Sequence, residues 1–488
     1  MKQLLTFCAL LIFTQNVWAQ KKIEFVEYDL SNGLHVILHQ EPTTPIVAVS
    51  ILYHVGSKNE KVGRTGFAHF FEHLLFEGST NIERGEYDKI VERNGGTLNA
   101  NTSNDRTYYY ELMPSNQLEL GLWLESERLL HAKVNIKGIE TQRSVVKEEK
   151  RQRVDNQPYA SFITEIFKRV FINHPYNWVP IGSMEDLDAA QEEDYINFYR
   201  TFYVPKNATL SIAGDINIPQ TKAWIEKYFG SIPAGQGINL VRDMENMSDD
   251  DFFAAYSISK ADLQNQNFSN PSTPAAKNVI SKMTGTPIVI ERPANYTGHL
   301  TGVQRDTVLD NIQLPGLFYA YNYPNQTNPD FYALEMLHDV LSGGSSSRLK
   351  KSIVEKKELG VETFSFAYGL EAGGVGIFGT IVGDGVDLKV VEAEFDSQIA
   401  LIQNELISAE EFEKIRNLKE NEIVSSNSTI AGIAENLADN YVYYGSANRV
   451  NTLLDGYMKV TREDIQRVAK KYLTQDARLI LYYLPKEK

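Results

Sequence analysis

His69-Phe70-Phe71-Glu72-His73, within the apolar stretch Gly66 to Phe76, is the segment from which the fold and the chemistry of this chain can best be predicted. The apolar residues of this stretch recur at helical spacing, which predicts a helix. On a helix, two histidines four residues apart and a glutamate three residues after the first share one face. Two neutral imidazoles suit zinc, and a carboxylate beside them can take a proton from metal-bound water. The alternative is a pair of histidines with a purely structural role.

The segments on both sides of this helix have the patterns of strands. Residues 22–40 alternate apolar and polar side chains around Ser31-Asn32-Gly33, which predicts two strands joined by a tight turn. Residues 45–53 are a further predicted strand, and residues 208–215 are another that ends in a turn. The amphipathic stretch 219–229 closes this part of the chain. Strands and helices alternate, so the fold is predicted to be of the α+β class.

The remainder of the chain is predicted to repeat this organisation. Residues 236–300 are rich in Asn, Ser, Asp and Gln, which is typical of a linker or an insertion. Beyond them, Ala333 to His338 can be laid over Ala68 to His73. We therefore expect two related α/β sandwich halves, each a sheet with packed helices. The N-terminal domain, residues 20–235, carries the metal motif, and residues 301–488 are a homologous C-terminal domain.

The first residues of the chain resemble an export signal. Residues 1–19 contain Lys2, a short apolar core and small residues at the end, which predicts a signal peptide cleaved after Ala19 and a periplasmic or secreted protein. The apolar core is too short for a membrane span, and none is expected elsewhere. The only cysteine, Cys8, lies in this signal, so a metal must be held by His, Asp or Glu. A net charge of −15 argues against nucleic acid as a partner.

The order His-x-x-Glu-His is that of inverted zinc-peptidase motifs, and the residues around it extend the likeness. The matching segments are His54 to Glu60, Thr65 to Ala68, Phe76 to Ser79, Gly95 to Ala100, His174 to Tyr176, Ile181-Gly182, Pro205 to Asp215 and, more weakly, Ser345 to Leu349. On these residues the chain resembles the pitrilysin/insulinase family of zinc metallopeptidases, closest to the branch of mitochondrial processing peptidase and its bacterial relatives. The resemblance implies a zinc metalloendopeptidase whose two halves form half of a clam-shell chamber around a peptide or unfolded protein substrate.

The resemblance also implies a third metal ligand, a glutamate on a later helix. The segment Gln142 to Glu149 fits that place, with Glu149 favoured and Glu148 as the alternative. One zinc ion per chain would then be held by His69, His73 and Glu149, while Glu72 acts as general base on the zinc-bound water.

A substrate-binding strand is implied in the same way. Residues 95–102 are predicted to form a strand after a glycine turn, and Asn99 and Ala100 match the edge strand on which family members bind the substrate backbone. An exposed edge offers unpaired N–H and C=O groups to an extended peptide with little demand on its sequence. An ordinary strand within a sheet is the alternative.

The sequence departs from the family pattern at three positions. Gln142 stands where many members have a second glutamate, and Val354 and Val361 stand where complete members have an Arg and a Tyr that support the developing oxyanion. Since valine cannot donate a hydrogen bond, the resemblance implies a homologous second subunit that carries the Arg and Tyr. Arg348 and Tyr368 are nearby substitutes within this chain. The alternative function is a weakly active or inactive metal-binding subunit that serves as peptide-binding or assembly partner of a homologous chain.

Overall fold

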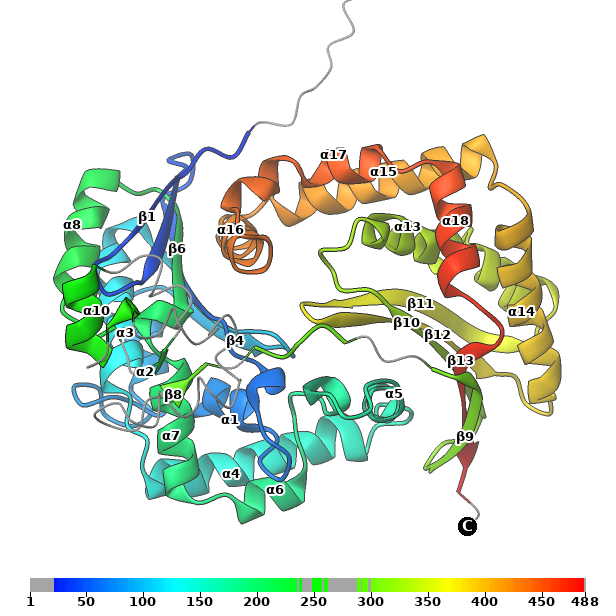
Figure 1. The fold of residues 1–488 in the computed structure, drawn as a ribbon, viewed down its shortest axis with the longest axis horizontal. Coiled ribbons are helices and arrows are strands. Elements are labelled where there is room, and N and C mark those ends of the chain that lie inside the picture. The colour runs from blue at the N-terminus through cyan, green and yellow to red at the C-terminus, as the bar shows by residue number, and fades with distance from the viewer. Residues whose placement is uncertain are drawn as a thin grey trace, which may run out of the picture.

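The computed structural model describes residues 22–234, 237–238, 248–256, 259–261, 288–290, 292–296 and 300–486. The predicted signal, residues 1–19, and most of the predicted linker, residues 236–300, lie outside these described residues. Figure 1 shows two halves side by side, each a sheet covered by helices. The structure therefore confirms the α+β class and the two sheet-and-helix halves.

The first half is built on a mixed six-stranded sheet. Its strands are β1 Val26–Asp29, β2 His35–Gln40, β3 Ile46–Tyr53, β4 Thr97–Thr102, β5 Thr107–Pro114 and β6 Ala208–Gly214, in the order β1-β2-β6-β3-β5-β4. Strands β1 and β2 pair antiparallel across the predicted turn, where Gly33 takes the left-handed φ of 84° that glycine tolerates best. Strand β4 is the edge of the sheet, as predicted for residues 95–102.

The helices of the first half bury an apolar core against this sheet. They are α1 Phe67–Leu74, α2 Tyr87–Arg93, α3 Leu118–His131, α4 Ile136–Lys150, α6 Met184–Ala189, α7 Glu192–Phe202 and α8 Ile218–Phe229. Helix α1 shows why the predicted helix forms. Its buried side chains Phe67, Phe70, Phe71 and Leu74 follow the 3.6-residue repeat and face the core. The opposite face of α1 is left to the polar residues of the motif.

The second half repeats this topology. Its strands are β9 Gly302–Asp310, β10 Gly316–Tyr323, β11 Gly360–Leu370, β12 Gly373–Val382 and β13 Ala477–Pro485, in the order β11-β12-β10-β13-β9. When each strand is matched to the strand at the same place in the first half, this order reads β4-β5-β3-β6-β2. The pair β13–β9 is parallel, as is the pair β2–β6. The helices are α13 Asp330–Ser342, α14 Leu388–Asn404, α15 Ala409–Ser426, α16 Ile430–Tyr444, α17 Leu453–Met458 and α18 Arg462–Tyr472. Helices α1 and α13 are thus equivalent, as are α4 and α15.

Each half lends one helix to the sheet of the other, as Figure 1 shows for α16 beside β6. Helix α5, Phe162–Val170, buries Ile166 and Phe167 with side chains of the second sheet. Helix α16 buries Ala434 and Leu437 with side chains of the first sheet. The predicted division into residues 20–235 and 301–488 stays a proposal, because packing crosses that boundary in both directions.

A buried polar cluster fixes the turn between β11 and β12 to the first half. Lys58 Nζ lies 3.0 Å from Asp105 Oδ1 and also pairs with Glu371, whose Oε2 lies 2.6 Å from His54 Nε2. The Tyr176 hydroxyl donates a further hydrogen bond of 2.6 Å to Asp105. A buried ammonium group must be paired in this way to remain charged, so the cluster holds the halves at a defined spacing.

Two short strands, β7 Gly237–Ile238 and β8 Ile288–Val289, pair in parallel, and α10, Asp249–Tyr256, is the remaining helix with described bounds. Within the described residues, none of the helices combines the length and the apolar character that crossing a membrane requires.

Candidate metal centre

Helices α1 and α4 bring His69, His73 and Glu149 together. One ligand atom from each of the three lies within 4.8 Å of the others. His73 Nε2 is 2.9 Å and His69 Nε2 is 3.5 Å from the same carboxylate oxygen, Glu149 Oε2. Glu148, the alternative third ligand, points elsewhere: its exposed carboxylate accepts hydrogen bonds from Arg151 and Gln152 at 3.2 and 3.0 Å. Of the two carboxylates, Glu149 is the one beside the histidines.

The start of α1 is held by a buried carboxylate that comes from the predicted segment His54 to Glu60. Glu60 accepts hydrogen bonds from the N–H groups of Gly66 and Ala68, both 2.9 Å long. These acceptors are favourable because the first N–H groups of a helix lack partners within it, and burial raises the pKa of Glu60 despite them. Gly66 itself has φ of 91°, a left-handed conformation suited to glycine. These contacts set the rotation of α1 and so the direction of its histidines.

The three donor groups fit one divalent metal ion such as zinc. Glu149 Oε2 is buried and has no hydrogen-bond partner of acceptable geometry among the described residues. The two imidazole rings stand almost perpendicular, at 86°, with their centroids 4.9 Å apart. His69 and then His73 hold the pKa of Glu149 well below its usual value, which keeps the carboxylate ionised as a ligand must be. Two nitrogens and one oxygen within 4.8 Å of one another match a typical catalytic zinc set.

Glu72 lies on the same face of α1, between the two histidines in sequence, and is half-buried. Burial first, and then the charges of neighbours that include Glu72, raise the pKa of Tyr109 and Tyr203. Both tyrosines are fully buried, and Tyr109 donates a 2.8 Å hydrogen bond to the carbonyl of Phe71. The Glu72 carboxylate thus lies close enough to these two buried tyrosines for its charge to act on both.

The predicted substrate strand packs beside the motif helix. Strand β4 contacts α1 and, among the residues that the structure describes, pairs on one side only, with Asn99 opposite Tyr110 and Ala100 opposite Tyr109. Asn99 is exposed, whereas Ala100 is half-buried against the core of the first half. The other side of β4 is the free edge of the sheet. Both predicted residues therefore lie on an edge strand beside the candidate metal centre.

Two contacts around Glu149 were not predicted from the sequence. Gln142 donates a 2.5 Å hydrogen bond to Glu77, which also pairs with Arg84. The carboxylate next to Gln142 is therefore that of Glu77, which follows the C-terminal end of α1. In many family members the resemblance implies a glutamate of α4 at the place of Gln142 itself. On the far side, Arg153 Nη1 lies 2.7 Å from Glu149 Oε1. Nothing in the pattern of charges from Lys147 to Arg153 distinguishes Arg153.

Val354, Val361 and their nearby substitutes Arg348 and Tyr368 all lie in the second half. Val354 lies in the π-helical segment Lys350–Lys356, and Val361, 59% exposed, lies at the start of β11. Arg348 is held by Glu411 of α15 through two hydrogen bonds of 2.9 and 2.7 Å. Tyr368 donates a 3.4 Å hydrogen bond to Asn104 at the junction of the halves. Arg348 and Tyr368 are both engaged in contacts that maintain the fold.

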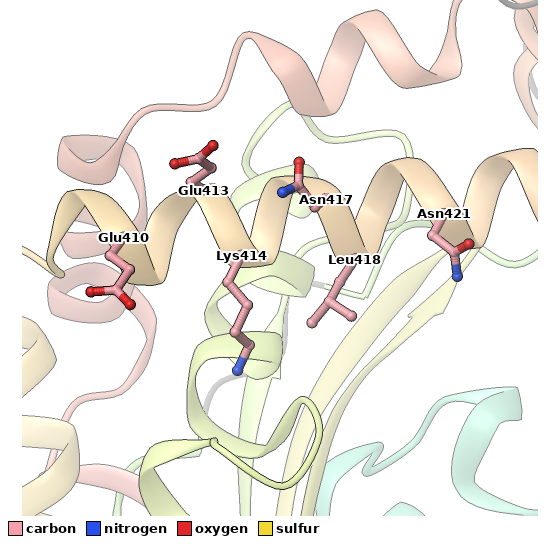
Figure 2. A pocket seen from close by; sticks show the side chains of 6 residues that line it. All are labelled: Glu410, Glu413, Lys414, Asn417, Leu418 and Asn421. Carbon is pink, nitrogen blue, oxygen red and sulfur yellow. The ribbon is translucent and has the colours of Figure 1, made fainter.

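An open hollow lies on α15 of the second half (Figure 2). Its lining residues all come from that helix: Glu410, Glu413, Lys414, Asn417, Leu418 and Asn421. None of the six is a histidine, and Lys414 is occupied by a 2.8 Å hydrogen bond to Ser346. The hollow is therefore distinct from the candidate metal centre on α1 and α4.

Comparison with known proteins agrees with this geometry. Residues 35–177 match the family model "Insulinase (Peptidase family M16)", and residues 189–419 match "Peptidase M16 inactive domain". The zinc protease PqqE of Helicobacter pylori is 28% identical over 459 residues, which cover 93% of this chain and 92% of that protein. The crystal structure of a protease from Helicobacter pylori has a TM-score of 0.78 at 26% identity and covers 95% of this chain and 100% of that chain.

A third relative shows the fold in a longer chain. The periplasmic protease PqqL from Escherichia coli matches with a TM-score of 0.66 at 17% identity. The match covers 94% of this chain and 47% of that one. The fold of the present chain therefore corresponds to about half of PqqL.

Proposed function

We propose that this chain, which belongs to the pitrilysin/insulinase family (peptidase family M16), is a zinc-dependent endopeptidase for extended or unfolded peptides. The convergence of His69, His73 and Glu149, beside Glu72 and next to a free sheet edge, is the observation that carries the proposal. Homologues named zinc proteases support the peptidase class.

The proposed roles follow from the positions of the side chains. His69, His73 and Glu149 would hold one zinc ion per chain, which when bound supplies a Lewis acid for the scissile carbonyl and the attacking water. Glu72 accepts the proton of that water and passes it to the leaving amine. It is suited to this because it shares the polar face of α1 without being one of the three grouped ligands.

The free edge of β4 would bind the substrate. Main-chain hydrogen bonds to an edge strand require an extended peptide and select little for side chains. Asn99 and Ala100, on the strand that contacts α1, would place the scissile bond near the metal centre. Unfolded segments meet this requirement, whereas folded proteins hide their backbone.

A homologous second subunit would complete the site. Val354 and Val361 cannot donate hydrogen bonds, and Arg348 and Tyr368 are engaged with Glu411 and Asn104. The likeness to about half of PqqL supports a working unit of two such folds. Export to the periplasm, or secretion, belongs to the same proposal.

A second function, a weakly active or inactive metal-binding subunit, is favoured by the same two valines and by the match of residues 189–419 to an inactive domain. The Glu72→Gln variant separates the two functions, assayed with zinc analysis and cleavage of an unstructured peptide. We expect it to keep its zinc and lose peptide hydrolysis, with Glu148→Gln as the control that keeps both. Equal hydrolysis by wild type and Glu72→Gln would exclude Glu72 as the general base. A zinc-loaded wild type without turnover, even beside a homologue, would favour the second function.

A further inference from the structure

We infer that Arg153 is a positioning residue that holds Glu149 as a ligand through one oxygen only. The inference rests on the proposed function, since it concerns the same metal centre. Its basis is the division of the Glu149 carboxylate between two sets of neighbours. Oε2 lies 2.9 Å from His73 Nε2 and 3.5 Å from His69 Nε2, whereas Oε1 lies 2.7 Å from Arg153 Nη1.

This division leaves a single oxygen for the metal. A carboxylate can use both oxygens at once, so occupation of Oε1 by a guanidinium does not prevent Oε2 from acting as a ligand. It does fix the rotation of the carboxylate and disfavours binding through both oxygens. A ligand held through one oxygen leaves more of the coordination sphere open, which a catalytic site needs for water and substrate.

The backbone around Arg153 is unusual in a way that fits a special position. Helix α4 ends at Lys150 and continues as a π-helical turn over Arg151–Asp155, closed by a 2.8 Å hydrogen bond from the Asn156 N–H to the Arg151 carbonyl. π-Helical turns are rare overall, but those that occur often lie at functional sites. The turn begins two residues after Glu149 and contains the arginine that contacts it.

Two opposite effects of Arg153 on the metal can be compared by size. Its positive charge opposes a cation nearby, but the side chain is 76% exposed, so solvent screens this repulsion. Hydrogen-bonding partners that orient a metal ligand commonly change metal affinity by about 10- to 100-fold. Orientation should therefore outweigh charge, and removal of Arg153 should weaken zinc binding.

Arg151 provides a matched control. It lies in the same turn and carries the same charge, but it pairs with Glu148 at 3.2 Å instead of with Glu149. Both arginine side chains are largely exposed, 76% for Arg153 and 52% for Arg151, so truncation of either should leave the fold intact. The melting temperature of each metal-free variant checks this directly.

The experiment measures zinc affinity of the full chain by competition with a chelating dye, in wild type, Arg153→Ala, Arg153→Lys and Arg151→Ala. We expect Arg153→Ala to bind zinc about tenfold more weakly or worse. Arg153→Lys, which keeps a donor but loses the planar fork, should lie between Arg153→Ala and wild type. Arg151→Ala should stay within about twofold of wild type, because its charge is screened.

The possible failures are distinguishable. Equal affinities of Arg153→Ala and Arg151→Ala, or tighter zinc binding by Arg153→Ala, would overturn the positioning role while the metal centre stands. A wild type that binds no zinc would overturn the proposed function and this inference with it.

Discussion

The equivalent helix pairs of the two halves, α1 with α4 and α13 with α15, differ in what lies between them. In the first half, His69 and His73 lie beside Glu149, and donor atoms of the three residues are within 4.8 Å of one another. In the second half, His338 is 3% exposed, lies 2.9 Å from the Tyr323 hydroxyl and stacks on a phenylalanine of the sheet. The same topology therefore groups two histidines with a carboxylate in one half and packs one histidine as a core residue in the other.

Leu334 stands where the first half has His69, and a lysine of α15 adds to this difference. Lys419 Nζ lies 3.1 Å from Asp339 of α13 and 2.9 Å from Glu422. A permanent cation thus occupies the polar space between these helices. Burial and the charge of Lys419 lower the pKa of His338 to about 3. The comparison teaches that one or two side chains, and not the topology, decide which helix pair can hold a metal ion.

Removal of that lysine is expected to have the largest effect. Lys419→Met leaves the partly buried Asp339 without its cation, which should destabilise the protein by about 3 kcal/mol, the low end for a broken buried pair because Asp339 can take up a proton. Lys414→Met is the matched control on the same helix, since its partners are the uncharged Gly343 and Ser346. Denaturant unfolding measures both. Similar losses for the two variants would show that Lys419 has no special role.

The second prediction concerns what the second half contributes to turnover. Because Val354 and Val361 cannot donate hydrogen bonds, the isolated chain should cleave unfolded peptides slowly. Removal of one oxyanion donor commonly costs about 100- to 1,000-fold in turnover. A homologue without the zinc motif but with the Arg and Tyr, when co-expressed, should therefore raise the rate at least about tenfold. Brisk turnover by the isolated chain would place the donors in this sequence, and Arg348 and Tyr368 would be mutated first.

The smallest expected effect is a pH dependence that arises from His338. Its folded pKa of about 3 lies below the unfolded value of about 6.5, so the unfolded chain takes up a proton first as the pH falls. Stability is therefore unaffected by this group well above pH 6.5 and declines as the pH falls toward 3. Between pH 8 and pH 5.5 it should fall by about 1.4 kcal/mol. His338→Gln should lose this part of the acid sensitivity in denaturant titrations, and unchanged acid sensitivity would contradict the assignment.

Local patterns in the sequence predicted the elements that position the site. The turn at Gly33, strand β3, helix α1 and strand β4 follow from periodicity or turn chemistry, and the structure confirms them. The position of β4 at a sheet edge was expected only from the family resemblance. Glu149 was favoured over Glu148 only through the family resemblance, because both carboxylates belong to one run of charges. Their opposite directions depend on how α4 packs against α1, which no local pattern encodes.

The features that the sequence did not reveal depend on contacts between distant segments. Helices α5 and α16 each bury an apolar face against the sheet of the other half. The apolar spacing would be the same if each helix packed on its own sheet, so periodicity does not reveal the exchange. Lys58 and Glu371 are 313 residues apart, and each resembles a surface charge until the halves are brought together. Arg153 is exposed and differs from its neighbours only by the side chain it contacts.

The zinc content of purified wild type, Glu149→Gln and Glu148→Gln tests the central claim most directly, namely that the first helix pair holds a metal and the second does not. We predict about one zinc ion per chain in the wild type and in Glu148→Gln, and far weaker retention in Glu149→Gln, because only Glu149 lies beside His69 and His73. The claim would be contradicted by a wild type that holds no zinc or two zinc ions per chain. Loss of zinc in Glu148→Gln instead of Glu149→Gln would also contradict it.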